Sequence, residues 1–372
     1  MCFRSGTLLT SNASSRRGSG EGLELGKPVD GAELDTAQAV LALAHVPDQP
    51  GVAAQLFEAL SSAGLNVDLI VQSTHEGSSN DIAFTVADTQ LAAAEQVCRD
   101  LLAGLGPDAA GATLSTEAGM AKLSISGAGI MGRPGVAARL FDTLAKQGIN
   151  LRLIATSEVK VSCLVAGHQG NKALQAAASC FELGEHQLQL NPAPSGRGEP
   201  EVRGVALDRD QAQVAVRRIP DRPGTAAAVC RALADAAISL DAIVQSERTH
   251  GEGEQRSRDM GFCLKRDDLD RARTALQPLL NQWPGASFEE GLAISRVSAV
   301  GAGMPCTAGT AARMFRSLAE AGINIEMIAT SEIRTSCVVA EADGITALRA
   351  VHAAFGLGGA VRYQAQGTEA PV

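Results

Sequence analysis

Aromatic side chains and long apolar runs are both scarce in this sequence. Only 3% of its 372 residues are aromatic, so the core must be built from alanine, valine, leucine and isoleucine, and platforms that stack nucleic-acid bases are not expected. No apolar run approaches the roughly 20 residues that cross a bilayer. The formal net charge of −9 likewise argues against a nucleic-acid or membrane partner.

Cysteine motifs and a secretion signal are also missing. The eight cysteines show no CxxC spacing and no Cys/His cluster, so no metal site is predicted. Cys163 and Cys337 lie in strand-like apolar runs, where a small buried hydrophobe is the simplest interpretation. Residues 1–22 form a polar stretch without an apolar signal core. We therefore expect a cytoplasmic location.

The stretch ISGAGIMGRPG raises the possibility of a nucleotide-binding loop. Gly127, Gly129 and Gly132 have the spacing GxGxxG between a strand-like and a helix-like run, as in a dinucleotide-binding turn. That fold requires a parallel strand after the helix, whereas here the next strand is followed at once by another and indicates a hairpin. A second copy of the stretch has Cys306 in place of the third glycine. We interpret the glycines as a tight strand-to-helix turn.

Internal repeats define the organisation of the chain. HVPDQPGVAAQLF from His45 recurs as RIPDRPGTAAAVC from Arg218, 173 residues later, and SISGAGIMGRPG from Ser124 recurs as SAVGAGMPCTAG from Ser298, 174 residues later. The two halves of this double unit also align with each other. Four similar units therefore follow one another, each with a glycine that opens its first helix: Gly51, Gly135, Gly224 and Gly309.

Each unit has the same predicted order of elements. A short apolar strand leads through a Pro/Gly turn into an amphipathic helix, followed by a two-stranded hairpin, an alanine-rich helix and a final short strand. This βαββαβ order predicts an α+β protein of four ferredoxin-like units arranged as two pairs. The expected boundaries are a polar tail at 1–36, unit 1 at 37–116, unit 2 at 117–190, a linker at 191–208, unit 3 at 209–290 and unit 4 at 291–372.

Several phrases resemble a known family. VPDQPGVAAQLF with SNDIAFTV, and ISGAGIMGRPGVAARLF with LIATSEVKVSCLV, resemble the paired ACT domains of the regulatory region of aspartate kinase (aspartokinase). The closing VHAAFGLGGAVRYQAQGT is similar to the C-terminal end of that family, and SGTLLTS at residues 5–11 is similar to a remnant of the end of its catalytic domain. The resemblance implies a four-ACT regulatory region that lacks the catalytic domain, either as a separate subunit or as a truncated product. It implies no catalytic residues and no cofactor in this chain, with ATP and Mg²⁺ only where a catalytic domain is present.

The resemblance also implies an effector, lysine and/or threonine, bound between paired ACT units. Independently of the family, the first turn of a helix offers free amides for an α-carboxylate, and a nearby carboxylate and side-chain amide can hold the ammonium group. In the first pair the predicted effector-binding residues are Asp48, Gly51, Ala53 and Gln72, facing Ala137, Asn150 and Leu151, which the resemblance implies as lining residues of the effector pocket. In the second pair they are Asp221, Gly224, Ala226 and Gln245, facing Ala311, Asn324 and Ile325.

Structural interpretations of the same residues stay open. An aspartate before proline suits a tight turn, and the asparagines could cap a strand. An amide at the end of an otherwise apolar strand, as at Gln72, favours binding. The TSE triplets at 156–158 and 330–332 could be purely structural. The second pair departs from the first, with Ser239 where unit 1 has Asn66, so the first pair is expected to be the binder.

Three hypotheses about function follow. The leading one is an allosteric amino-acid sensor that acts on an aspartate kinase catalytic domain or subunit and self-associates through its ACT units. The second is a fragment of an active aspartate kinase, which phosphorylates L-aspartate with ATP. The third is an assembly module that binds no ligand.

Overall fold

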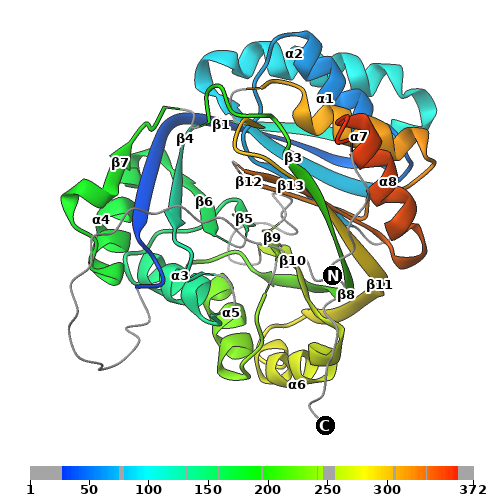
Figure 1. The fold of residues 1–372 in the computed structure, drawn as a ribbon. Coiled ribbons are helices and arrows are strands. Elements are labelled where there is room, and N and C mark those ends of the chain that lie inside the picture. The colour runs from blue at the N-terminus through cyan, green and yellow to red at the C-terminus, as the bar shows by residue number, and fades with distance from the viewer. Residues whose placement is uncertain are drawn as a thin grey trace, which may run out of the picture.

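A computed structural model describes residues 27–74, 79–130, 133–157, 159–193, 196–240, 242–245, 256–304, 307–331 and 333–358. The four predicted units are present, the fourth described as far as its second helix, with helices on the outside of the molecule and strands inside (Figure 1). Units 1 and 2 contain β1 (Gly31–Pro47), α1 (Val52–Ser62), β2 (Ile70–Thr74), β3 (Ser79–Ala87), α2 (Leu91–Gly104), β4 (Thr113–Ser126), α3 (Val136–Lys146), β5 (Ile154–Thr156), β6 (Lys160–Ala166), α4 (Gly170–Phe181) and β7 (Leu188–Leu190). Units 3 and 4 contain β8 (Gly204–Pro220), α5 (Thr225–Asp235), β9 (Ala242–Gln245), β10 (Ser257–Lys265), α6 (Leu269–Leu280), β11 (Ser287–Val300), α7 (Thr310–Glu320), β12 (Met327–Ser331), β13 (Arg334–Ala340) and α8 (Gly344–Ala354).

The first helix of each unit begins where the sequence predicts. The preceding glycine has a left-handed backbone, with φ of 103° at Gly51 and 89° at Gly309, and no side chain caps either helix. This conformation costs a glycine little and any other residue more. Along α1, Leu56, Phe57 and Leu60 recur at helical spacing and are buried. The repeat therefore specifies four short helices with one apolar face and an uncapped start.

The strands of the described residues form one sheet of thirteen strands that closes on itself. The order is β3-β2-β12-β13-β11-β8-β10-β9-β5-β6-β4-β1-β7, and β3 also pairs with β1. Helices α1, α2, α7 and α8 cover the strands of units 1 and 4, and α3 to α6 cover those of units 2 and 3 (Figure 1). A third core, which includes Val71, Leu153, Val244 and Ile294, lies between these two layers.

The pairing of the units differs from the expected one. The sequence-based prediction set unit 1 against unit 2 and unit 3 against unit 4, and this is wrong. In the structure α1 packs on α7 and β2 pairs with β12, while α3 packs on α5 and β5 pairs with β9. The reason is that β4 is one continuous strand shared by units 1 and 2, and β11 is shared by units 3 and 4. Consecutive units are thereby carried into opposite layers, so their edge strands cannot meet.

The two stretches assigned to a tail and a linker both contribute to the sheet. β1 begins at Gly31, and its residues 31–35 pair with β4 and with β7 in the layer of unit 2. β8 begins at Gly204, and residues 204–208 pair with β11 in the layer of unit 4. Units 2 and 4 are therefore completed by strands that precede units 1 and 3 in the chain. The SGTLLTS stretch and the closing VRYQAQGT lie outside the described residues.

Gly127 and Gly129, and Gly301 in the second copy, leave room for the segment that leads into β1 or β8 and crosses the following unit. A Cβ at Gly127 would lie 2.3 Å from Pro28 O, and one at Gly129 would lie 2.6 Å from Pro28 Cα. The second copy has the same arrangement, since a Cβ at Gly301 would lie 2.0 Å from Glu201 O. A side chain at these positions would displace the crossing segment. Gly132 and Cys306 lie outside the described residues.

Two further expectations concern side-chain burial and membrane association. Cys163 and Cys337 are fully buried, which confirms that they are small core hydrophobes, and burial raises the pKa of the Cys163 thiol to about 12. In the part of the chain that the structure describes, no helix combines the length and the apolar character needed to cross a membrane.

Candidate effector clefts between paired units

The predicted site residues come together in two clusters, in a different combination from the expected one. Asp48, Gly51, Ala53 and Gln72 lie beside Asn324 and Ile325 of unit 4. Asp221, Gly224, Ala226 and Gln245 lie beside Asn150 and Leu151 of unit 2. The expected facing of Asp48 with Asn150, and of Asp221 with Asn324, is wrong because the units pair differently. Ala137 packs against the core of units 2 and 3, and Ala311 lines a separate cavity described below.

The cluster of units 1 and 4 lies at the start of α1, and we call it the α1 mouth. The side-chain amides of Asn324 and Asn80 each donate to Asp48 Oδ1 over 2.7 Å. Gln72 is 3% exposed, and its Nε2 donates to Ile325 O in unit 4 over 2.6 Å. Gln72 Oε1 and Asn80 Oδ1 are buried and accept no hydrogen bond from any described residue. The α1 mouth therefore gathers acceptor oxygens that lack a donor.

A second acidic group adds to the negative charge of the α1 mouth. Burial raises the pKa of Glu326, and the negative charge of Asp48 raises it further. Asp48 itself accepts its hydrogen bonds from the neutral amides of Asn324 and Asn80. The side chains fill the mouth almost completely, so a ligand there requires a small opening of the cleft.

The cluster of units 2 and 3, at the start of α5, has a different charge balance. Asn150 Nδ2 donates to Asp221 Oδ1 over 3.0 Å, and Gln245 Nε2 donates to Leu151 O over 3.2 Å, as in the other pair. Here, however, the buried guanidinium of Arg258 lies 3.0 Å from Asp221 Oδ2. Burial would raise the pKa of Asp221, but the charge of Arg258 and the hydrogen bond from Asn150 hold it below its ordinary value.

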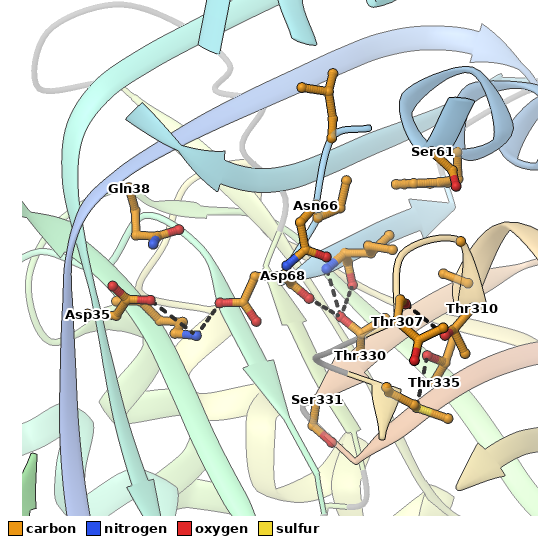
Figure 2. Close-up of a pocket in the computed structure, with 18 of the residues that line it drawn as sticks. Asp35, Gln38, Ser61, Asn66, Asp68, Thr307, Thr310, Thr330, Ser331 and Thr335 are labelled. Carbon is orange, nitrogen blue, oxygen red and sulfur yellow. Dashed lines mark hydrogen bonds and ion pairs between the residues drawn. The ribbon is translucent and has the colours of Figure 1, made fainter. Parts of the chain in front are cut away.

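A larger cavity opens at the start of α7, between units 1 and 4 on one side and residues of β1, β4 and 189–193 on the other. Its volume is about 370 Å³, and we call it the α7 cavity. Lys122 Nζ is hydrogen-bonded to Asp68 and lies 3.9 Å from Asp35, so two carboxylates share one ammonium group. Figure 2 shows these acidic side chains toward one end of the cavity and the hydroxyls of Thr307 and Thr310 toward the other.

Sequence reasoning missed the α7 cavity, although the repeat contained the signal. Asn66 and Asp68 occupy the positions in unit 1 that Asn324 and Glu326 occupy in unit 4. Because equivalent elements of units 1 and 4 meet, α1 with α7 and β2 with β12, the start of either first helix should offer a site at this interface. Ala311, which lines this cavity, was nominated from the sequence but grouped with Asp221, and Asn66 and Asp68 were not nominated. Applying the same rule to all four helix starts would have found the cavity.

The TSE triplets connect paired units. Thr330 Oγ1 accepts a hydrogen bond from Ile70 N of unit 1 over 2.7 Å, and Thr156 Oγ1 accepts one from Ile243 N of unit 3 over 2.8 Å. These hydroxyls satisfy backbone groups where two edge strands meet. These bonds support a structural role for the two threonines, of which Thr330 also lines the α7 cavity. Glu158 and Glu332 lie outside the described residues.

Comparison with known families defines the class of the protein. A family profile described as ACT domain matches residues 40–101 and 214–281, and a second profile with the same description matches 123–181 and 297–355. These four segments coincide with units 1, 3, 2 and 4. The chain belongs to the ACT-domain family.

Within that class, the chain is similar to aspartate kinases. It is 44% identical over 156 residues to the aspartokinase of Thermus thermophilus, covering 42% of this chain and 38% of the relative. It is 31% identical over 222 residues to the aspartate kinase of Pseudomonas fluorescens, covering 60% and 52%. The crystal structure of aspartate kinase from Synechocystis matches with a TM-score of 0.85 and 45% identity, over 93% of this chain and 58% of that one. The chain thus spans less than two thirds of each of these relatives.

The Synechocystis structure corrects one expectation. The chain was expected to be a regulatory region of a kind that lacks the catalytic domain. Its match over 93% of its length is to an aspartate kinase, of which it covers 58%. The comparison supports aspartate kinase with ACT domains, and the assignment to a form without a catalytic domain is withdrawn.

Proposed function

We propose that this chain is the amino-acid-sensing part of an aspartate kinase, an enzyme that phosphorylates L-aspartate with ATP. Lysine, threonine or both bind between units 1 and 4 and shift the enzyme toward an inhibited state. The partner in this regulation is the kinase domain of the same enzyme, and self-association through the ACT units stays a prediction. The similarity to aspartate kinases supports the assignment of the enzyme.

One observation carries the proposed ligand class. In the α1 mouth, the buried oxygens of Gln72 and Asn80 have no donor among the described residues, and Asn80 contacts the carboxylate of Asp48. An unpaired buried acceptor costs about 1–3 kcal/mol, and an ammonium group would supply three donors and a compensating charge. The uncapped first turn of α1 can bind the α-carboxylate of the same molecule.

The α7 cavity offers a second place for an amino acid at the same interface. Two carboxylates, those of Asp68 and Asp35, lie around the ammonium group of Lys122 at one end of the cavity. The uncapped start of α7 lies at the cavity wall, where Thr310 and Ala311 are lining residues. A zwitterion can therefore place its ammonium near Asp68 and its carboxylate near α7.

Differential affinity is what turns binding into regulation. An amino acid shifts the kinase only if it binds one arrangement of the paired units more tightly than the other. Coupling of about 1–3 kcal/mol corresponds to a change of about 5- to 150-fold in the conformational equilibrium.

The test is isothermal titration of the chain with lysine, threonine and both together. Binding at millimolar concentration or below is expected. Gln72→Ala should weaken it at the α1 mouth and Asp68→Asn at the α7 cavity, whereas Asp100→Asn on an exposed face of α2 serves as the control. Silence toward all three titrants would refute the sensor and favour a pure assembly module. In the complete kinase, the same amino acids should lower the rate of aspartyl phosphate formation, and Gln72→Ala should relieve that inhibition.

A further inference from the structure

The two inter-unit clusters are built from equivalent positions, with one exchange of charge. Asp48 corresponds to Asp221 and Asn324 to Asn150. Asn80 pairs with Val46 across the sheet, and Arg258 pairs with Ile219, the counterpart of Val46. Arg258 therefore holds the place of Asn80 in the same strand register.

Arg258 makes contacts on both sides of the interface between units 2 and 3. It is 1% exposed, its Nε lies 3.0 Å from Asp221 Oδ2 in unit 3, and its Nη1 donates to Arg152 O in unit 2 over 2.9 Å. Asp221 is itself 4% exposed at its side chain. In the α1 mouth, by contrast, both hydrogen bonds that Asp48 accepts come from neutral amides.

A second pair of equivalent positions, Glu326 and Arg152, also differs in charge between the two clusters. Unit 4 contributes Glu326 beside Asp48, while the equivalent position in unit 2 is Arg152, which forms an ion pair with Glu117 at 3.1 Å. The α1 mouth thus combines two carboxylates with amides, and the other cluster combines the carboxylate of Asp221 with the guanidinium of Arg258. The negative charge of the α1 mouth can attract the ammonium group of an amino acid.

We propose that Arg258 is a tethered substitute for a ligand, whose guanidinium occupies at Asp221 the place that the cation of a free amino acid occupies at Asp48. The interface of units 2 and 3 is then held permanently in a ligand-bound-like arrangement, and effector binding is confined to units 1 and 4. The comparison with the effector rests on the proposed function, but the occupation of the Asp221 site by Arg258 can be tested without any effector.

The first experiment exchanges the two residues and counts binding sites by isothermal titration with lysine and with threonine. Arg258→Asn should add one further binding event per chain, and Asn80→Arg should abolish binding at the α1 mouth. Far-UV circular dichroism and retained binding at units 1 and 4 show that Arg258→Asn is folded. An unchanged number of sites in this folded variant contradicts the proposal, as does loss of a site from the parent chain on Asp221→Asn.

The second experiment uses methylguanidinium as the probe and needs no amino-acid effector. Arg258→Ala should lower Tm, and millimolar methylguanidinium should restore most of the loss by rebinding at Asp221. Arg231→Ala, which removes an exposed guanidinium ion-paired with Asp142, is the control and should show no rescue. Absence of rescue in Arg258→Ala overturns the proposal. If the parent chain binds neither lysine nor threonine, the proposed function fails while this rescue still decides the role of Arg258.

Discussion

The side-chain amide of Asn324 donates a hydrogen bond to Asp48 Oδ1 over 2.7 Å, although the two residues are 276 positions apart. This contact joins the first unit of the chain to the last. The matching contact, from Asn150 to Asp221, joins the two middle units. The candidate clefts therefore form only when the entire four-unit region has folded, and neither double unit can build one of these clusters from its own residues.

Replacing Thr330 by valine should weaken the interface between units 1 and 4. The change keeps the shape of the side chain but removes the oxygen that accepts the Ile70 N–H, which is then buried without a partner. Loss of about 1–3 kcal/mol in the free energy of unfolding is expected, measured by denaturant titration. Thr330→Ser retains the hydroxyl and should lose much less. A valine variant as stable as the parent would show that water or a backbone shift replaces this bond.

Replacing Gly127 by alanine should destabilise the crossing of strand β1 over unit 2. The added Cβ would lie 2.3 Å from Pro28 O and 2.8 Å from Val29 Cα, and backbone atoms cannot move aside as a flexible side chain can. A loss of about 1–3 kcal/mol is expected, as for other overpacked sites, and a lower Tm would report it. Gly104→Ala near the end of α2 is the matched control, because its Cβ would meet no atom within 4 Å. Equal Tm values for both variants would refute the packing argument.

The stability contributed by Glu326 should depend on pH with a defined sign. Burial and the charge of Asp48 raise its pKa in the folded state above the ordinary value of 4.5, so the folded chain binds this proton more tightly than the unfolded chain. Its contribution is therefore most favourable below pH 4.5 and is lost as pH rises through the folded pKa.

Glu326→Gln should consequently raise the free energy of unfolding near pH 7 and change it much less near pH 4. Denaturant titrations at several pH values measure the difference from the parent, with the exposed Glu185→Gln as control. A gain that is the same at both pH values would mean that the carboxyl group does not titrate as described.

Much of the secondary structure of each unit could be predicted because the sequence patterns that specify it are local. The spacing of Leu56, Phe57 and Leu60 marks one face of a helix, and the glycine before the helix marks its start. The four repeated copies gave the number of units and the types of residue at each mouth. Asp48 and Gln72 were nominated from their places at a helix start and a strand end, and Asn324 from the resemblance to aspartate kinase.

The sequence by itself determined four βαββαβ units with uncapped helix starts and a polar group at each inter-unit contact. Only the tertiary structure decided which unit faces which, because β4 and β11 carry consecutive units into opposite layers and leave β2 to pair with β12 and β5 to pair with β9. The tertiary structure also decided the balance of charge in each cluster. Arg258 is one basic residue among many in the sequence, and it neutralises Asp221 because the folded sheet places the two side chains together, away from water.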